Sequence, residues 1–351
     1  MDWKSFQQNQ NPDLPEEIND LAAQRLVEPE LKEDWAALED LAEDLLLPID
    51  FLQNVDWLIK DKSAIIFSGP PGSGKTYLAR ALAKYYSKER RLFLQFHPSY
   101  AYEDFVEGFR PQHNVERGLT YEIIPGPLRL IASAAQNALE ESRNAGVEPP
   151  LFALVLDEIN RANLSKVLGE LFFALEYREQ PVTLQYSRDT LLLPPNLIIF
   201  GTMNTADRSI ATFDIALRRR FHFVDCNPLR PPFSDLLFKY LSKLGRADMF
   251  WLAELLELAN QRIPDPAFVV GPSYFMRSDI SKDIAERVWR YSVRPYLTSR
   301  FEAEAIPDLT WDALRSAVTG KPVEARENDE PIVDIGFVAS EQDSDADEAV
   351  E

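Results

Sequence analysis

Short runs of consecutive apolar residues alternate with longer stretches of helical periodicity through the middle of the chain. Runs that are apolar at nearly every position are typical of strands buried on both faces, as in a parallel sheet that helices cover on either side. The pattern therefore predicts an α/β fold with a parallel sheet. The runs are AIIF (64–67), LFLQF (92–96), LFALVL (151–156), NLIIFGT (196–202) and FHFVD (221–225).

Two further segments alternate in a way that favours antiparallel pairing. PVTLQYSRDTLLLP (181–194) has apolar arms on both sides of a polar turn, which predicts a β-hairpin. GLTYEIIPG (118–126) is a candidate for another hairpin.

Helical spacing dominates the flanks of this core. One or two amphipathic helices are expected between about 16 and 47, packed on the next domain or docked to another protein. Their apolar positions are Leu31, Trp35, Leu38, Leu41 and Leu45. We expect four parts in all: an acidic helical extension (1–50), an α/β domain (51–228), a smaller α-helical domain (229–322) and a disordered acidic tail (323–351).

The formal net charge of -20 is concentrated at the two ends of the chain. Residues 1–50 hold 14 acidic and 3 basic side chains, and residues 323–351 hold 11 acidic and 1 basic. The middle of the chain is therefore close to neutral, which neither supports nor excludes contact with phosphates.

Targeting signals and disulfide chemistry are not indicated. No run approaches about eighteen consecutive apolar residues, so we expect no membrane span. The start, MDWKSFQQNQNPDLPEE, lacks a basic region followed by an apolar one, and Cys226 has no second cysteine to pair with. These features favour a cytoplasmic protein.

A glycine-rich segment, GPPGSGKT (69–76), lies between the first apolar run and a helical stretch. It matches G-x-x-x-x-G-K-[ST] in the strand–loop–helix context that a phosphate loop requires. Glycines let the backbone aim its N–H groups inward, and the helix N-terminus adds partial positive charge. Lys75 would reach the β- and γ-phosphates, and Thr76 would offer its hydroxyl to Mg²⁺. The expected nucleotide-binding residues are Gly69, Pro70, Pro71, Gly72, Ser73, Gly74, Lys75, Thr76 and Tyr77.

A pair of carboxylates ends the apolar run at 151–156. Asp157 would hold Mg²⁺ together with Thr76, partly through water. Glu158 would act as a general base or orient the attacking water. A solvated acidic strand end is the simpler interpretation of such a pair, but about eighty residues after a phosphate loop the catalytic one is favoured.

A polar residue and a row of arginines follow the run at 196–202. Asn204 is placed to hydrogen-bond the attacking water or the γ-phosphate. The arginines precede the last apolar run, and they suit an arginine finger that neutralises charge on the transferring phosphoryl group of a neighbouring subunit. Arg220 is the first candidate and Arg219 the second.

Several longer motifs resemble the McrB family of AAA+ proteins. They are PSYAYEDFVEGFRP (98–111), DEINRANLSKVLGELFFALE (157–176), GTMNTADRSIATFDIALRRRF (201–221) and FVVGPSYFM (268–276). The resemblance implies an AAA+ large domain with a five-stranded parallel sheet, a small α-helical lid, and hexameric rings with nucleotide between subunits. It also implies an McrC-type partner that stimulates hydrolysis and carries or recruits a nuclease.

The resemblance adds Asn160 and Arg161 to the catalytic residues and Ser273, in the lid motif, to the nucleotide-binding residues. The family usually has His where Pro272 stands, which puts a histidine contact from the lid in doubt. McrB proteins of the restriction type also carry a large N-terminal domain that reads modified DNA. Here an acidic segment of about fifty residues precedes the α/β domain, and it cannot supply that basic surface. Contact with DNA is therefore expected through a partner or the ring pore.

Three hypotheses follow for the function. The first is a ring-shaped NTPase motor or switch of an McrBC-like restriction or anti-phage defence complex. The second is a MoxR-like chaperone ATPase that remodels protein partners. The third is a nucleotide-bound scaffold with vestigial hydrolysis, against which the intact catalytic motifs argue. The substrate is expected to be ATP or GTP, because the phosphate loop reads phosphates and not bases. The resemblance to the McrB family, which includes enzymes that prefer GTP, slightly favours GTP.

Overall fold

The computed structural model describes residues 35–114, 118–206, 215–302 and 305–320. The expectations for most of the N-terminal extension and for the acidic tail lie outside the described residues. The strands are β1 (Ala64–Gly69), β2 (Arg91–Gln95), β3 (Glu107–Asn114), β4 (Gly118–Pro125), β5 (Phe152–Asp157), β6 (Val182–Thr183), β7 (Thr190–Leu191), β8 (Leu197–Asn204) and β9 (His222–Asp225).

Helices fall into two groups along the chain. Those of the α/β domain are α3 (Leu38–Leu45), α4 (Ile49–Lys62), α5 (Lys75–Ser87), α6 (Tyr102–Phe105), α7 (Pro127–Ala145), α8 (Leu164–Leu168), α9 (Leu171–Glu176) and α10 (Ile215–Arg220). Those of the second domain are α11 (Leu236–Lys243), α12 (Phe250–Arg262), α13 (Lys282–Val288), α14 (Arg294–Thr298) and α15 (Trp311–Thr319).

The central sheet has five parallel strands in the order β2-β5-β8-β1-β9. Each of the five predicted apolar runs contributes one strand, so the expected α/β fold with a five-stranded parallel sheet is confirmed. The strands of the middle are buried on both faces: Ile65, Ile66 and Phe67 of β1 are all fully buried. This double burial explains why β1 is a continuous apolar run rather than an alternating one.

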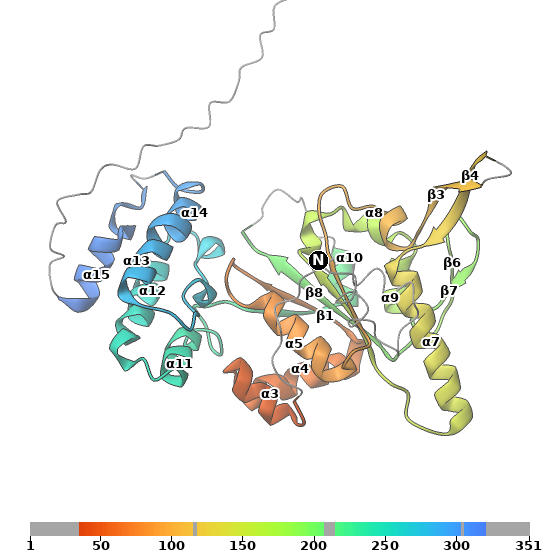
Figure 1. Cartoon of the computed structure of the whole chain (residues 1–351), viewed down its shortest axis with the longest axis horizontal. Coiled ribbons are helices and arrows are strands. Elements are labelled where there is room, and N and C mark those ends of the chain that lie inside the picture. The colour runs from red at the N-terminus through yellow and green to blue at the C-terminus, as the bar shows by residue number, and fades with distance from the viewer. Residues whose placement is uncertain (1–34, 115–117, 207–214, 303–304, 321–351) are drawn as a thin grey trace, which may run out of the picture.

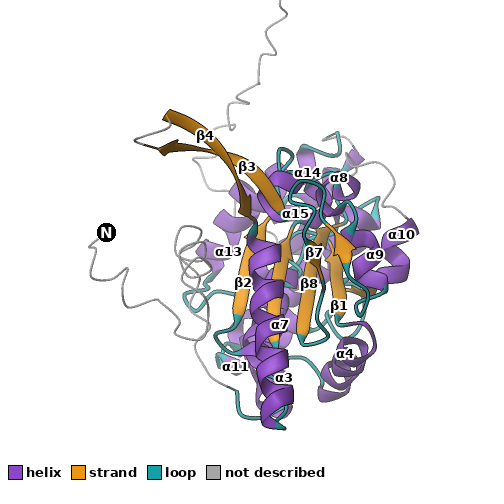
Figure 2. Cartoon of the chain, turned by 90° about the vertical axis from the view of Figure 1, so that its right-hand side faces the viewer, coloured by secondary structure: helices purple, strands orange, loops and turns teal. Residues whose placement is uncertain are grey.

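Helices cover both faces of the sheet. Ile65 and Phe67 point to the face packed by α3, α4 and α5, whereas Ile66 points to the face packed by α7, α8 and α9. In Figure 2, α7 lies in front of the sheet across one of these faces. The successive residues of one strand therefore belong to two separate hydrophobic cores, as the two-residue period of a strand requires.

Two small hairpins extend from the α/β domain. β6 and β7 pair antiparallel within 181–194, so the hairpin predicted there is confirmed. The hairpin expected within 118–126 is wrong, because 118–125 is one continuous strand, β4, that pairs along its length with β3. The apolar positions of β4 form one arm of the β3–β4 hairpin. The other arm is β3, whose Pro and polar residues gave no strand signal. Figure 2 shows the β3–β4 ribbon projecting from the molecule.

The second domain is a cluster of helices beside the α/β domain (Figure 1). It has its own core, in which Phe275, Trp289 and Trp311 are buried, and the Trp289 indole N–H donates to the carbonyl of Leu309 at 3.1 Å. Among the helices of the described residues, none is long and apolar enough to cross a bilayer.

Candidate functional site

The phosphate loop joins the carboxyl end of β1 to the N-terminus of α5. Gly72 and Gly74 have φ values of 75° and 89°, a region that a side chain would strain, so glycine is needed at both turns. Lys75, the first residue of α5, is buried, and its Nζ donates to the carbonyl of Pro70 at 2.7 Å. The ammonium group and the first amides of α5 therefore meet at one concave end of the sheet, which suits an anion.

Oxygen ligands for a hard cation converge beside this loop. Thr76 Oγ1 donates to Asp157 Oδ1 at 2.7 Å, and Thr202 Oγ1 donates to the same oxygen at 2.5 Å. Asp157 is buried at the end of β5, and β8 lies between β5 and β1, the strand that leads into the loop. A hydroxyl and a buried carboxylate are donors that Mg²⁺ prefers, so Thr76 and Asp157 fit the metal assigned to them. Thr202, which the sequence analysis did not select, orients that carboxylate.

Glu158 lies one residue beyond Asp157 in a left-handed conformation, with φ of 54°. This conformation is costly for a residue with a side chain. Its amide donates to Thr202 Oγ1 at 3.0 Å, and its Oε2 lies 2.8 Å from Arg161 Nε. Gln95 at the end of the neighbouring β2 also reaches Glu158 Oε2, at 3.5 Å. Thr202, Arg161 and Gln95 therefore all hold Glu158 in place. Of these three, only Arg161 was predicted from the sequence to lie at the site.

Asn204 is brought to the loop by strand register. It ends β8 and pairs with Gly69, the last residue of β1, and the amide of Thr205 donates to the Gly69 carbonyl at 3.0 Å. Asn160 is buried, and its Nδ2 donates to the Asn204 carbonyl at 3.0 Å, while its Oδ1 has no hydrogen-bond partner. Asn160 thus supports the backbone at Asn204, and it leaves one buried acceptor available to a donor from a ligand or water.

The arginines lie at the opposite edge of the sheet. They end α10 just before His222, and His222 pairs with Ile65 near the start of β1, whereas the phosphate loop follows the end of that strand. The six residues of β1 span roughly 20 Å, longer than an arginine side chain. The arginines therefore cannot reach the phosphates bound by their own chain.

The two candidate arginines differ in their surroundings. Arg220 is half-buried, forms an ion pair with Glu176 at 2.8 Å and lies 5.3 Å over the ring of Phe172. Arg219 is exposed, and its carbonyl accepts from Lys62 Nζ at 2.9 Å. Arg220 is thus engaged within its own chain, whereas the Arg219 guanidinium faces solvent.

The helical domain contacts the phosphate loop directly. The amide of Gly271 donates to the carbonyl of Pro71, and the amide of Ser273 donates to that of Gly72, both at 3.0 Å. A Cβ added at Gly271 would lie 2.0 Å from the carbonyl carbon of Gly72, so no side chain fits there. Asn260 of α12 holds the segment in place by exchanging two hydrogen bonds with Val270, of 2.7 and 2.9 Å.

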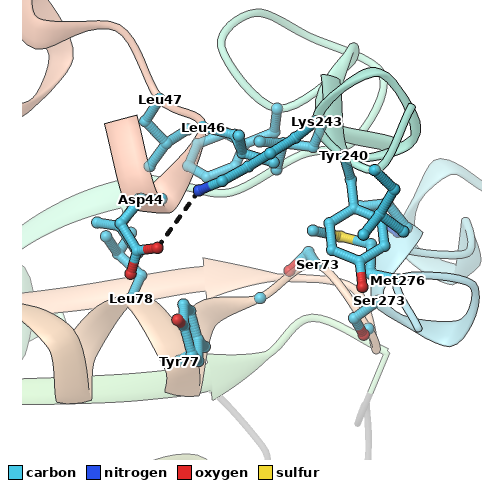
Figure 3. Close-up of a pocket in the computed structure, with 17 residues that line it drawn as sticks. Asp44, Leu46, Leu47, Ser73, Tyr77, Leu78, Tyr240, Lys243, Ser273 and Met276 are labelled. Carbon is cyan, nitrogen blue, oxygen red and sulfur yellow. Dashed lines mark hydrogen bonds and ion pairs between the residues drawn. The ribbon is translucent and has the colours of Figure 1, made fainter. Parts of the chain in front are cut away.

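A pocket of about 640 Å³ opens beside the loop, between α3, α5 and the helical domain (Figure 3). Gly72, Ser73 and Gly74 form part of its wall, and Tyr77 and Ser273 line it as well. The volume lies in the range of small-molecule sites. Burial and then the charge of Asp44 raise the pKa of Tyr77 above its ordinary value, so this hydroxyl stays neutral. The predicted residues Tyr77 and Ser273 thus meet at one cavity beside the phosphate loop.

Two family descriptions match the chain. Residues 64–221 match the AAA domain (dynein-related subfamily), and residues 251–304 match the McrB alpha-helical lid domain. The first range covers four of the five sheet strands and the site residues from Gly69 to Arg220, and ends just before β9; the second covers the segment that contacts the loop.

Two of the curated relatives are restriction-system components. The chain is 34% identical over 262 residues to the type IV methyl-directed restriction enzyme EcoKMcrB subunit of Escherichia coli K12, covering 71% of this chain and 54% of the relative. It is 28% identical over 199 residues to the type II restriction enzyme BsuMI component YdiS of Bacillus subtilis 168, covering 45% of this chain and 55% of that relative. The chain therefore spans about half the length of these relatives.

Proposed function

Because this chain is an AAA+ protein of the McrB type, with a McrB-type lid after its AAA domain, we propose that it hydrolyses a nucleoside triphosphate as the motor or switch of a restriction complex. The observation that carries the proposal is the pairing of Thr76 with buried Asp157 beside the Lys75 ammonium. This arrangement provides a cation, an anion cradle and a metal-binding carboxylate within one small volume.

The phosphates bind through the loop amides and Lys75. Gly72 and Gly74 turn the backbone so that its N–H groups face the anion, and Lys75 moves from the Pro70 carbonyl to the β- and γ-phosphates. Thr76 and Asp157 would hold Mg²⁺, which would neutralise charge on the phosphates. Thr202 keeps the Asp157 carboxylate oriented toward this site.

Hydrolysis then needs a water molecule in line with the γ-phosphorus. Glu158 accepts a proton from the water while the water oxygen bonds to the γ-phosphorus. The bond between the γ-phosphorus and the β–γ bridging oxygen breaks, which releases the nucleoside diphosphate. Asn204 hydrogen-bonds the water or the γ-phosphate, and Arg161 orients the Glu158 carboxylate, at 2.8 Å. Metal binding and base catalysis thus use different groups, Asp157 and Glu158.

The site is completed by a second subunit. We assign the arginine finger to Arg219, because Arg220 is paired with Glu176 of its own chain and supports the end of α10. The distance between the two sheet edges supports a finger that acts on a neighbour, and we propose that the subunits close into a hexameric ring. Arg220 remains a candidate for the same role if it exchanges Glu176 for the neighbour's phosphate.

The partner is proposed to be an McrC-like subunit that stimulates hydrolysis and supplies or recruits a nuclease. The likeness to an McrB subunit and to the BsuMI component YdiS supports this partner. The match to the McrB lid supports it over a MoxR-like chaperone. DNA would be contacted through that partner or in the ring pore.

Glu158→Gln tests the proposed hydrolysis. The amide keeps the size of the side chain but accepts no proton, so turnover should fall about 100-fold or more while nucleotide binding persists. Phosphate release and nucleotide affinity are measured for the full chain with Mg²⁺, with the co-purifying partner present and absent. Glu148→Gln is the matched control, because Glu148 is exposed on a loop before β5.

Two results would contradict the assignment. Unchanged turnover in Glu158→Gln removes Glu158 from the reaction. Wild-type protein that binds nucleotide but never releases phosphate, even with its partner, favours the scaffold hypothesis instead.

A further inference from the structure

The last turn of α4 meets the end of α10 at the amino edge of the sheet. Lys62 Nζ donates to the carbonyl of Arg219 at 2.9 Å. One residue earlier on α4, the Asp61 carboxylate lies 2.7 Å from Nε2 of His222, the first residue of β9. Residues 219–222, which we call the finger segment, are therefore bound to α4 at both of their ends.

The topology of the sheet explains why these groups meet. α4 ends at Lys62 and leads through Ser63 into β1, so its last residues lie at the amino end of that strand. β9 starts beside β1, with His222 paired to Ile65. Two segments that lie 157 residues apart in the chain thus come together at one edge. Figure 2 shows α4 and α10 on the side of the sheet where β1 lies.

α10 depends on such contacts for its position. It has only six residues, too few for a helix to be stable through its own hydrogen bonds. Carbonyls in the last turn of a helix lack partners within the helix, and the Arg219 carbonyl belongs to that turn. A cation there also interacts favourably with the partial negative charge of the helix end. Lys62 therefore stabilises the end of α10 with a charge-assisted hydrogen bond.

α9 holds the finger segment from a second side. Arg220 forms an ion pair with Glu176 of α9, at 2.8 Å, and lies over the ring of Phe172 on the same helix. The backbone of the segment is thus fixed between α4 and α9, whereas the Arg219 side chain stays exposed. An exposed guanidinium on a fixed backbone suits a group that must reach a site on another molecule.

We propose that Lys62 and Asp61 are positioning residues for the arginine finger. Holding a long arginine side chain on a neighbour's γ-phosphate costs conformational entropy. A fixed backbone lowers that cost and sets the direction of approach, and a misplacement of about 1 Å can slow a reaction about 100-fold. This inference rests on the proposed function, in which the finger acts on a neighbouring subunit. It applies to Arg219 and Arg220 alike, since both belong to the finger segment.

Lys62→Met tests the contact to α10. Methionine keeps an unbranched apolar stem but donates no hydrogen bond. Turnover of the full chain with its co-purifying partner, at saturating nucleotide and Mg²⁺, should fall about tenfold, while nucleotide affinity stays within about threefold. Lys62→Arg keeps a cationic donor and should restore most of the turnover. Asp61→Ala, which removes the contact to His222, should also lower turnover and spare affinity.

Lys60→Met is the matched control on the same helix. The Lys60 ammonium pairs with Asp56 of α4 at 2.6 Å, and the side chain is 74% exposed. The substitution removes the same charge from α4 without touching the bond to Arg219, so turnover should stay at the wild-type level. Equal losses in Lys60→Met and Lys62→Met would show that only the charge of α4 matters, and would overturn the proposal.

Mixing experiments assign the defect to one edge of the sheet. Lys62→Met protein keeps Glu158, and Glu158→Gln protein keeps a positioned finger, so an interface between them unites both. Equal amounts and random assembly should give about a quarter of wild-type turnover, against about a twentieth if the two activities only add. Asn204→Ala in place of Lys62→Met is the negative control, because Asn204 and Glu158 share the carboxyl edge and no complete interface can form.

The possible failures are distinguishable. Wild-type turnover in Lys62→Met overturns the positioning role, as does a loss that mixing with Glu158→Gln fails to restore although it restores Arg219→Ala or Arg220→Ala. A purely structural role of Lys62 would lower nucleotide affinity and turnover together. If mixing restores neither arginine variant, the proposed interface between subunits is itself wrong.

Discussion

Glu107 is a fully buried carboxylate that the proposed reaction does not use. It lies at the start of β3, accepts from the amides of Tyr186 and Ser187 at 3.0 and 2.9 Å, and forms an ion pair with Arg129 of α7. Arg129 continues the network to Asp189 on the β6–β7 hairpin. One charge thus ties two hairpins and a helix together.

The pKa of Glu107 should make stability depend on pH. Burial raises this pKa, but the hydrogen bonds from Ser187 and Tyr186 and the charge of Arg129 together lower it below the ordinary value of 4.5. A depressed pKa means that the ionised form stabilises the fold above the unfolded-state pKa, and that this contribution is lost as the pH falls through the folded-state pKa.

Glu107→Gln is therefore expected to cost about 2 kcal/mol of unfolding free energy at pH 7, because a buried charged acceptor is lost. The difference from wild type should shrink as the pH falls below about 4.5. Urea unfolding at pH 7 and at successively lower pH measures it. Asp189→Asn, at the exposed end of the network, should cost less. A difference that stays constant with pH would show that the Glu107 charge is not stabilising.

Single residues at the site were predictable only where a local motif defines them. Lys75 and Thr76 are defined by the phosphate-loop motif, and Asp157 by the acidic end of an apolar run. The structure brings these segments together. Thr202 and Gln95 were not predicted, because their roles depend on the pairing of strands far apart in the chain. Their one sequence signal is a polar residue at a strand end, which many unrelated strands share.

At the scale of elements, the lid segment (268–276) packs tightly against the phosphate loop. Among the described glycines, Gly271 in this segment leaves the least room for an added Cβ. Gly271 packs against the backbone of Gly72 and Ser73, and an added Cβ would lie 2.0 and 2.2 Å from their atoms. Backbone atoms cannot move aside as a flexible side chain can. Phe268, Val269, Val270 and Phe275 anchor this segment in the lid core, so the lid would move away from the loop together with the segment.

Gly271→Ala should therefore displace the lid segment without unfolding the lid. We expect nucleotide affinity to fall at least about tenfold, or about 1.4 kcal/mol, because Ser273 leaves the pocket. Hydrogen exchange at 268–276 should rise while α12 stays protected. Gly245→Ala is the control: its φ of 68° costs about 1 kcal/mol, but its Cβ would meet no atom within 4 Å. Equal effects of the two variants on nucleotide affinity would contradict the account.

Elements were predictable where burial imposes a pattern. The fully buried strands of the sheet read as apolar runs, and their bounds agree with the structure to within a few residues. β3 escaped prediction because six of its eight residues are polar or Pro and it is stabilised by pairing with β4. Nothing in the residues of β4 alone reveals whether its partner precedes or follows it.

At the scale of the whole molecule, the catalytic parts lie on two edges of one sheet. The phosphate loop, Asp157, Glu158 and Asn204 occupy the carboxyl edge, and the arginines of α10 lie at the amino edge. The sequence suggested that the arginines serve a neighbouring subunit, and the register of β9 on β1 supplies a physical reason. This arrangement supports our proposal that a working site needs two copies of the chain.

Mixing two inactive variants tests this central claim most directly. Glu158→Gln protein keeps Arg219, and Arg219→Ala protein keeps Glu158, so an interface between them unites an intact base with an intact finger. At equal amounts and random assembly, about a quarter of the interfaces are complete, and phosphate release should recover to about that fraction of wild type. Arg220→Ala in place of Arg219→Ala tests the alternative finger. If neither mixture releases phosphate although the variants assemble together, the site does not lie between subunits.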